Sequence, residues 1–230
     1  MELSEFGARI ERALGPAAPD LPASLVESLE ALDALLTRWR KAVDLVGFKS
    51  DDEYLRRYFV EALAALPWLP EQGRALDIGS GGGSPALPLA LARRAVAWTL
   101  VEANERKALF LDEAIRTVGL DRAGATVVAE RYENVTLESP VDVVTLRGVA
   151  VTNAVLAKVA SDLRPGGRLL WFSSQERLSE ARERVGQPRQ AGQAGQVEQA
   201  WAVVDGPTLL VPGAGHLLVV EYREYGEPRG

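Results

Sequence analysis

The hydrophobic positions divide the chain into a helical first part and an alternating second part. From residue 22 to residue 44, apolar side chains recur at spacings of three and four residues, which predicts a helix with one buried face. A second helix is predicted over about residues 52–66, with Ser50 or Asp51 as its N-cap. We therefore expect residues 1–70 to form a helical extension that precedes the rest of the chain.

Beyond residue 70 the pattern changes to short apolar runs separated by helical stretches, an alternation that predicts a parallel sheet with helices on its faces. The predicted strands are residues 75–78, 97–101, 125–128, 141–145 and 168–172. A helix is expected at about residues 152–163 and a turn at residues 164–167. The predicted fold class is therefore α/β, with residues 71–230 as the main domain of a single structural unit.

The end of the chain carries two further apolar runs, at residues 201–204 and 216–222. Turn-rich residues 205–207 and 212–215 lie between them, so we expect a C-terminal hairpin with one strand antiparallel in the sheet. The preceding residues 186–200 are rich in Gln, Gly and Ala. This composition predicts a flexible connection, either disordered or a mobile flap.

The composition is that of an ordinary globular protein, with 47% hydrophobic and 25% charged residues. No apolar run reaches the roughly 18 residues that a membrane span needs, and the N-terminus lacks a secretory signal. The absence of cysteine predicts a cytoplasmic location. With no cysteine and a single histidine, we expect no metal site and no thiol nucleophile, which excludes the reactions that depend on them.

The net charge of −6 argues weakly against an extended nucleic-acid surface. One segment is nevertheless locally basic, with the positive residues Arg38, Arg40, Lys41, Lys49, Arg56 and Arg57. Acidic residues lie among them, namely Asp44, Asp51, Asp52 and Glu53. On charge alone, a solvated helix surface is the simpler interpretation.

A glycine-rich loop follows the first predicted strand, at the edge of the sheet where open α/β sheets bind ligands. It reads Asp77-Ile78-Gly79-Ser80-Gly81-Gly82-Gly83. A dinucleotide fingerprint would require Gly or Ala where this chain has Ser84. The spacing instead resembles the first motif of class I S-adenosylmethionine-dependent methyltransferases. That resemblance implies that Asp77 binds the amino group of the methionine moiety, directly or through water.

Two further strand ends carry candidate ligand contacts. Glu102 ends the second strand, where a carboxylate can accept hydrogen bonds from both ribose hydroxyls, and Ala103 follows it. After the third strand, Tyr132 is a candidate for stacking on adenine and Glu133 for orienting it. A ligand-free domain and an NAD-dependent dehydrogenase that uses Glu102 are the alternatives. The dehydrogenase alternative lacks a candidate residue for the proton transfer that accompanies hydride transfer. The only histidine, His216, is expected to be an ordinary strand residue.

Several segments together resemble the glucose-inhibited division protein B family of 16S ribosomal RNA guanine-N7 methyltransferases, from about residue 30 to residue 175. The most specific are the loop continuing through Ser84-Pro85-Ala86-Leu87-Pro88-Leu89-Ala90 and the pattern of Asn104, Lys107, Phe110 and Leu111. The others are residues 39–48, 56–66, 142–150 and 165–170.

The resemblance implies a Rossmann-like fold, S-adenosylmethionine as methyl donor, no metal, and 16S ribosomal RNA or the 30S particle as partner of a monomeric enzyme. Guanine N7 has an exposed lone pair, so its methylation needs orientation rather than a general base. Arg147 is the candidate catalytic residue, placed to hold the guanine O6 edge or a phosphate. The predicted cofactor site comprises Asp77, Gly79, Ser80, Gly81, Gly83, Ser84, Glu102, Ala103, Tyr132, Glu133 and Arg147.

The chain departs from the family pattern in four places, and the resemblance assigns them to the substrate side. This chain has Asp44-Leu45-Val46 for Asn-Leu-Thr, Arg57-Tyr58 for Arg-His, Ser173 for a lysine, and Gly215 for an arginine before His216. A small-molecule methyltransferase and a non-catalytic relative that binds the cofactor or the ribosome therefore stay open as alternatives.

Overall fold

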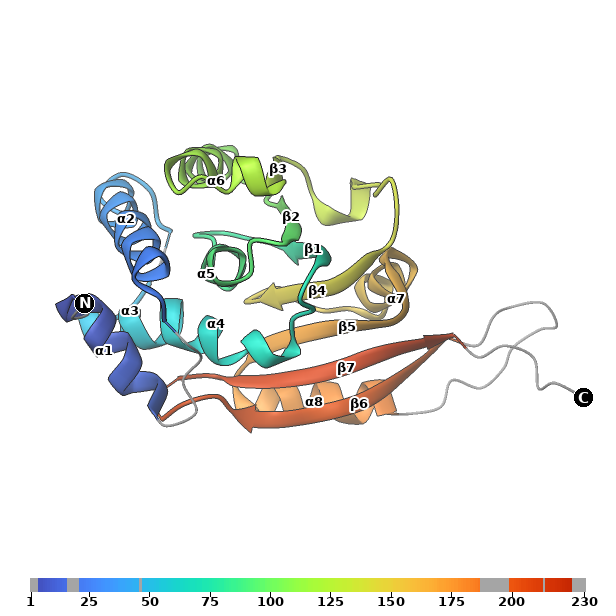
Figure 1. Ribbon diagram of the computed structural model, residues 1–230. Helices are drawn as coiled ribbons and strands as arrows, with labels where there is room; N and C mark the ends of the chain where they lie inside the picture. Colours follow the sequence, from blue (N-terminus) through green and yellow to red (C-terminus); the bar gives the residue numbers. More distant parts are fainter. Residues whose placement is uncertain (1–3, 16–20, 46, 187–198, 213, 225–230) are drawn as a thin grey trace, which may run out of the picture.

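The computed structural model describes residues 4–15, 21–45, 47–186, 199–212 and 214–224. In this part of the chain, one sheet runs through the molecule in the strand order β3-β2-β1-β4-β5-β7-β6 (Figure 1). The strands are β1 (Gly73–Ile78), β2 (Val96–Val101), β3 (Thr126–Val128), β4 (Val141–Arg147), β5 (Leu163–Ser173), β6 (Gln199–Leu209) and β7 (His216–Glu224). Strands β1 to β5 pair in parallel, and β7 is antiparallel to β5 and β6. The predicted parallel sheet and antiparallel hairpin are confirmed.

The helices before the sheet are α1 (Glu5–Leu14), α2 (Ala23–Trp39), α3 (Asp51–Leu55), the π-helical turn η2 (Arg56–Val60), α4 (Glu61–Ala64) and the 3₁₀ turn η3 (Leu66–Trp68). Those between and after the strands are α5 (Ala86–Ala92), α6 (Glu105–Thr117), η4 (Asp121–Ala123), η5 (Tyr132–Asn134), α7 (Asn153–Asp162) and α8 (Gln175–Gly186). The pattern analysis predicts neither α1 nor α8 individually.

The two faces of the sheet follow from the alternation of side chains along each strand. Ala75 and Val143 belong to the core that contains α1 to α6, whereas the next residues, Leu76 and Val144, belong to the core beneath α7 and α8. The helical extension therefore packs on the same face as α5 and α6. We propose on this basis that the extension and the sheet fold as one unit.

The second predicted helix is interrupted. Ser50 caps α3 as expected, since its hydroxyl accepts a hydrogen bond from the Glu53 N–H at 3.1 Å. One turn later the backbone widens into η2, a π-helical turn of a kind that often lies at functional sites. The first predicted helix also ends early, at Trp39 rather than near residue 44.

Two predicted turns are irregularities within strands. Residues 164–167 lie where β5 pairs Leu163 with Val141 and then Arg168 with Val143, so they bulge out of the ladder. Residues 205–207 lie inside β6, where the register with β7 shifts twice. Of the predicted flexible stretch 186–200, Gly186 ends α8 and Gln199 begins β6, and residues 187–198 lie outside the described residues.

The glycine at the base of α5 gives a test of this packing. A Cβ on Gly83 would overlap Leu87 Cδ1 and lie 3.2 Å from Leu111 Cδ2, with the backbone at φ +90°. Gly83→Ala should therefore lower the free energy of unfolding by about 2–4 kcal/mol, from strain and overpacking together. Gly119→Ala is the matched control, because Gly119 has φ +68° but no atom within 4 Å of its Cβ position.

Urea denaturation of both variants measures the difference. Gly119→Ala should lose only about 1 kcal/mol, the cost of the backbone conformation alone. Equal losses in the two variants would contradict the packing of the loop against α5.

Candidate functional site

The order of the strands reverses at β1, because the chain proceeds from β1 to β2 and β3 on one side and resumes with β4 on the other. The carboxyl ends of β1 and β4 therefore border the crevice in which doubly wound sheets bind ligands. Asp77 and Thr145 are direct partners across these two strands. The predicted acidic residue thus stands at the centre of the expected ligand crevice.

Asp77 is a buried carboxylate with one oxygen lacking a partner. It is 1% exposed, and the Thr145 hydroxyl donates a hydrogen bond to its Oδ1 at 2.6 Å. Its Oδ2 has no hydrogen-bond partner among the described residues. Burial raises the pKa of Asp77 to about 6, against the hydrogen bond from Thr145, which lowers it. A buried acceptor without a donor is costly, so a ligand ammonium group at Oδ2 would complete the site.

The glycines of the loop have different functions. Gly79, Gly81 and Gly83 all have positive φ. A Cβ on Gly81 would have nothing nearer than the Gly79 carbonyl oxygen at 3.7 Å, so this position leaves open space beside the loop. The corresponding space at Gly83 is filled by Leu87. Gly81 therefore fits a close approach by a ligand, whereas Gly83 serves the packing of α5.

Glu102 connects the ends of β1 and β2. Its Oε2 accepts a hydrogen bond from the Gly81 N–H at 2.7 Å, and its Oε1 accepts one from the Asn104 N–H at 2.8 Å. A carboxylate has about four acceptor positions, so both oxygens retain capacity for ribose hydroxyls. Ala103, predicted to contact the cofactor, follows directly and is exposed.

Tyr132 lies in the core beneath α7 rather than in the crevice. Its side chain is 6% exposed and its hydroxyl donates to Asp162 Oδ2 at 2.7 Å. The Lys158 ammonium lies 4.8 Å from the ring centroid. This position does not suit stacking of the Tyr132 ring on adenine. Glu133 is exposed in η5, and its contact with the cofactor stays a prediction.

The helical extension is hydrogen-bonded to the glycine loop through Tyr58. The Tyr58 hydroxyl donates to the Gly82 carbonyl at 2.6 Å, and the Ser84 hydroxyl donates to the Tyr58 carbonyl at 2.7 Å. Tyr58 is fully buried, which raises its pKa and keeps the hydroxyl as a donor. The expected place of Tyr58 on the substrate side is therefore wrong, because the residue contacts the loop from within. Ser84 likewise acts here on the protein's own backbone.

Arg147, at the end of β4, also connects the helical extension to the glycine loop. Its Nη1 donates to the Arg57 carbonyl at 2.5 Å and to the Ser84 hydroxyl at 3.2 Å. The side chain is 17% exposed, and burial lowers its pKa while the nearby Glu61 carboxylate opposes that shift. These contacts make Arg147 a positioning residue. Its predicted contact with the guanine stays a prediction.

Glu61 is the site residue that the sequence analysis misses. This carboxylate is 1% exposed, lies 3.9 Å from Arg147 Nη1 and 3.8 Å from Arg57 Nε, and accepts a hydrogen bond from the Gly215 N–H at 3.1 Å. A Cβ on Gly215 would lie 2.9 Å from Glu61 Oε1, so a larger residue there would press on this carboxylate. The only signal in the sequence is a single acid within the apolar run from Phe59 to Leu66.

A hollow opens beside the end of β4, on the face of the sheet that α8 covers. Its volume is about 410 Å³, and it is lined by residues 148–151 together with Trp171, Ser173, Arg177, Glu180, Ala181 and Arg184. Val149 belongs to this lining, and its Cγ2 would lie 2.7 Å from a Cβ on Gly79. The hollow and the glycine loop therefore share Val149 as a wall.

Of the six cations in the basic segment between residues 38 and 57, two form ion pairs in the described part of the chain. Arg38 pairs with Glu113 at 3.0 Å, and Arg40 lies 5.5 Å from the centroid of the Tyr54 ring. Arg57 lies near Glu53 and Glu61. No ion pair is found for Arg56 among the described residues.

In the described ranges, no helix is long and apolar enough to cross a membrane. The same ranges contain no group of three or more His, Asp or Glu side chains placed to hold a metal ion.

Comparison with known proteins decides the family. A family model described as rRNA small subunit methyltransferase G matches residues 25–199 of this chain. The chain belongs to this family. The ribosomal RNA small subunit methyltransferase G of Xanthomonas campestris pv. campestris (strain B100) is 34% identical and covers 88% of this chain and 95% of its own length. That of Aromatoleum aromaticum is 33% identical and covers 93% and 98%.

Solved structures support the fold. A putative rRNA methylase from Clostridium thermocellum matches with a TM-score of 0.51 at 15% identity, over 70% of this chain and 93% of that one. TYW2 of P. horikoshii in complex with MeSAdo matches with a TM-score of 0.53 at 14% identity, over 73% and 63%. At these identities the likeness shows the class I methyltransferase fold, which confirms the predicted fold class.

The unpartnered oxygen of Asp77 predicts how cofactor affinity depends on pH. An ammonium group binds the ionised carboxylate better than the protonated one, so the affinity for S-adenosylmethionine should rise as pH increases through about 6. Between pH 5 and pH 7 the gain should be about tenfold, the change in the ionised fraction. Calorimetry at several pH values measures it.

Asp77→Asn is the matched control, because the amide oxygen can still accept the hydrogen bond from Thr145. Its affinity should be lower and independent of pH. Methylthioadenosine, which lacks the amino group, should bind the wild-type protein equally at pH 5 and pH 7. A tenfold pH dependence that persists in Asp77→Asn would assign the effect to another group.

Proposed function

We propose that this chain transfers a methyl group from S-adenosylmethionine to N7 of a guanosine in 16S ribosomal RNA. The observation that carries the proposal is the buried Asp77, whose Oδ2 has no partner among the described residues. The open space at Gly81, in the loop that follows Asp77, supports it. Membership of the rRNA small subunit methyltransferase G family supports both the reaction and the acceptor. The proposal implies that the enzyme works in the cytoplasm as a monomer and without a metal.

Three residues of the crevice would hold the methionine and ribose parts of the methyl donor. Asp77 would bind the amino group, and Glu102 would accept hydrogen bonds from the ribose hydroxyls. Gly81 would leave room for the methionine part of the ligand to approach the loop. Its own N–H already donates to Glu102 Oε2. Bound S-adenosylmethionine supplies an electrophilic methyl group on its sulfonium sulfur.

The chain's own contribution to the reaction would be orientation. Guanine N7 carries a lone pair in the plane of the ring, so no residue has to remove a proton before the methyl group is attacked. Holding the reacting atoms about 3–3.5 Å apart and in line can supply several kcal/mol of the barrier reduction. Arg147 would support this geometry by fixing Arg57 and Ser84 around the loop.

The hollow beneath α8 offers a place for the acceptor base. It adjoins the carboxyl end of β4 and is separated from the glycine loop by Val149. Trp171 provides an apolar wall and Arg177 a cation at its rim, a combination that suits an unstacked base followed by a phosphate. Ser173, one of the departures from the family pattern, lines the same hollow.

Transfer of tritium from labelled S-adenosylmethionine tests the proposed reaction. We expect label in 30S subunits or 16S ribosomal RNA and none in 50S subunits or a panel of small molecules. Strand cleavage specific for N7-methylguanosine should then identify one nucleotide. Label in a small molecule and none in ribosomal RNA would overturn the acceptor, and cofactor binding without transfer to any acceptor would favour a non-catalytic relative.

A further inference from the structure

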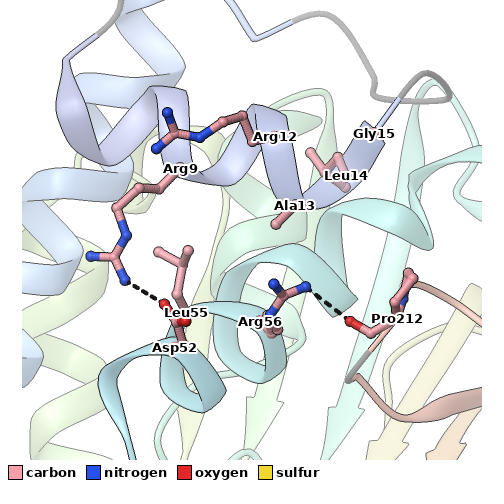
Figure 2. Close-up of a pocket in the computed structure, with 9 residues that line it drawn as sticks. All are labelled: Arg9, Arg12, Ala13, Leu14, Gly15, Asp52, Leu55, Arg56 and Pro212. Atoms are coloured by element: carbon pink, nitrogen blue, oxygen red, sulfur yellow. Dashed lines mark hydrogen bonds and ion pairs between the residues drawn. The ribbon is translucent and has the colours of Figure 1, made fainter.

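A hollow of about 450 Å³ lies between the helical extension and the C-terminal hairpin (Figure 2). Its lining includes Arg9 and Arg12 of α1 and Arg56 of η2, together with Asp52. Figure 2 shows Arg9 directed at Asp52 and Arg56 directed at Pro212, with the Arg12 side chain lying along the helix above them and its guanidinium on the side of Arg9, away from Arg56. Cationic side chains from segments far apart in the sequence therefore surround one space.

The charges around this hollow are not balanced. Among the described residues, Asp52 is the one acidic residue of the lining, and its carboxylate pairs with Arg9 at 3.1 Å. Arg56 donates one hydrogen bond to a neutral group, the Pro212 carbonyl, at 2.9 Å. Neither Arg56 nor Arg12 has an ion pair among the described residues. Within the described part of the chain, two guanidinium groups thus have no acidic partner, although the whole chain has a net charge of −6.

Such an arrangement is suited to a phosphate. A guanidinium carries five N–H donors in a planar fork that matches phosphate oxygens, and Arg56 uses one nitrogen for Pro212. Ala13, Leu14 and Leu55 form an apolar part of the lining that can pack against a sugar ring. Alternating phosphate and ribose groups are the repeating features of an RNA backbone.

Adjacent residues of η2 also connect the hollow to the glycine loop through hydrogen bonds. Arg56 lies in η2, next to Arg57, whose carbonyl accepts the hydrogen bond from Arg147, and near Tyr58, whose hydroxyl binds Gly82. An RNA backbone bound at Arg56 would therefore have a fixed position relative to the glycine loop. Backbone contacts of this kind set the position of an RNA without reading its sequence.

We propose that Arg12 and Arg56 bind a backbone phosphate of the RNA substrate at this hollow, which we call the α1 phosphate site. The site rests on the proposed function for its ligand, but its residues are separate from the cofactor crevice. It would act as a positioning site, with no part in the chemical step.

Binding of a labelled 16S ribosomal RNA transcript to the full chain tests the site directly. Arg12→Gln is the informative variant, because Arg12 is exposed and makes no hydrogen bond or ion pair with the described residues, so its loss should not disturb the fold. It should weaken RNA binding about tenfold, the usual size for one charge-assisted contact, and lower the slope of log affinity against log salt by about 0.7–0.9. Arg12→Lys should restore the slope.

The matched control is Arg122→Gln, which removes an exposed arginine from η4, next to β3 at the opposite edge of the sheet. It should leave RNA affinity unchanged. Unaltered binding in Arg12→Gln, or an equal loss in Arg122→Gln, would overturn the α1 phosphate site.

Two further readouts separate this site from the proposed function. With 30S subunits and tritiated S-adenosylmethionine, Arg12→Gln should raise KM for the subunits and leave both kcat and cofactor affinity unchanged. A fall in kcat or in cofactor affinity would contradict a positioning site. If the wild-type chain methylated no ribosomal RNA, the proposed function would fail, and the difference between Arg12→Gln and Arg122→Gln in RNA binding would still decide the phosphate site.

Discussion

The hydrogen bond from the buried Tyr58 hydroxyl to the Gly82 carbonyl ties the glycine loop to the helical extension. A loop with several glycines at positive φ has many accessible conformations, so its shape depends on contacts from outside. Ser84 and Arg147 add bonds that join the same loop to η2 and β4. The helical extension is therefore part of the ligand site, although none of its residues belongs to the glycine motif.

The two buried carboxylates near the glycine loop, Glu61 and Asp77, differ in how their charges are compensated. Glu61 is surrounded by Arg57, Arg147 and the Gly215 N–H, so its charge is compensated within the protein. Among the described residues, Asp77 accepts one hydrogen bond, from the Thr145 hydroxyl to Oδ1, and its Oδ2 has no partner. Desolvation accordingly raises the pKa of Asp77 to about 6. This incompletely bonded carboxylate stands near the carboxyl end of β1, where doubly wound sheets bind ligands, which is the expected condition of a binding residue.

The sequence predicts the sheet and the location of the site because both have local signals. Alternating apolar runs locate β1 to β5, and the spacing of Gly79, Gly81 and Gly83 locates the crevice. The role of each motif residue depends on the direction of its side chain, which the spacing of residues in the sequence does not reveal. Gly83 and Tyr132 lie at motif positions yet pack against Leu87 and Asp162, respectively. Glu61 contacts Arg147 and Gly215, which are distant in the sequence, so no local pattern reveals its role.

Calorimetric titration of S-adenosylmethionine into the wild-type protein and Gly81→Asp tests the central claim most directly. Gly81 has open space beside it and φ +53°, a conformation that aspartate tolerates better than most residues, so the variant should fold. Its carboxylate would occupy the space that the account assigns to the cofactor. We predict binding to the wild-type protein and none to a folded Gly81→Asp. Equal binding to both proteins, or binding of NAD in place of S-adenosylmethionine, would contradict the account.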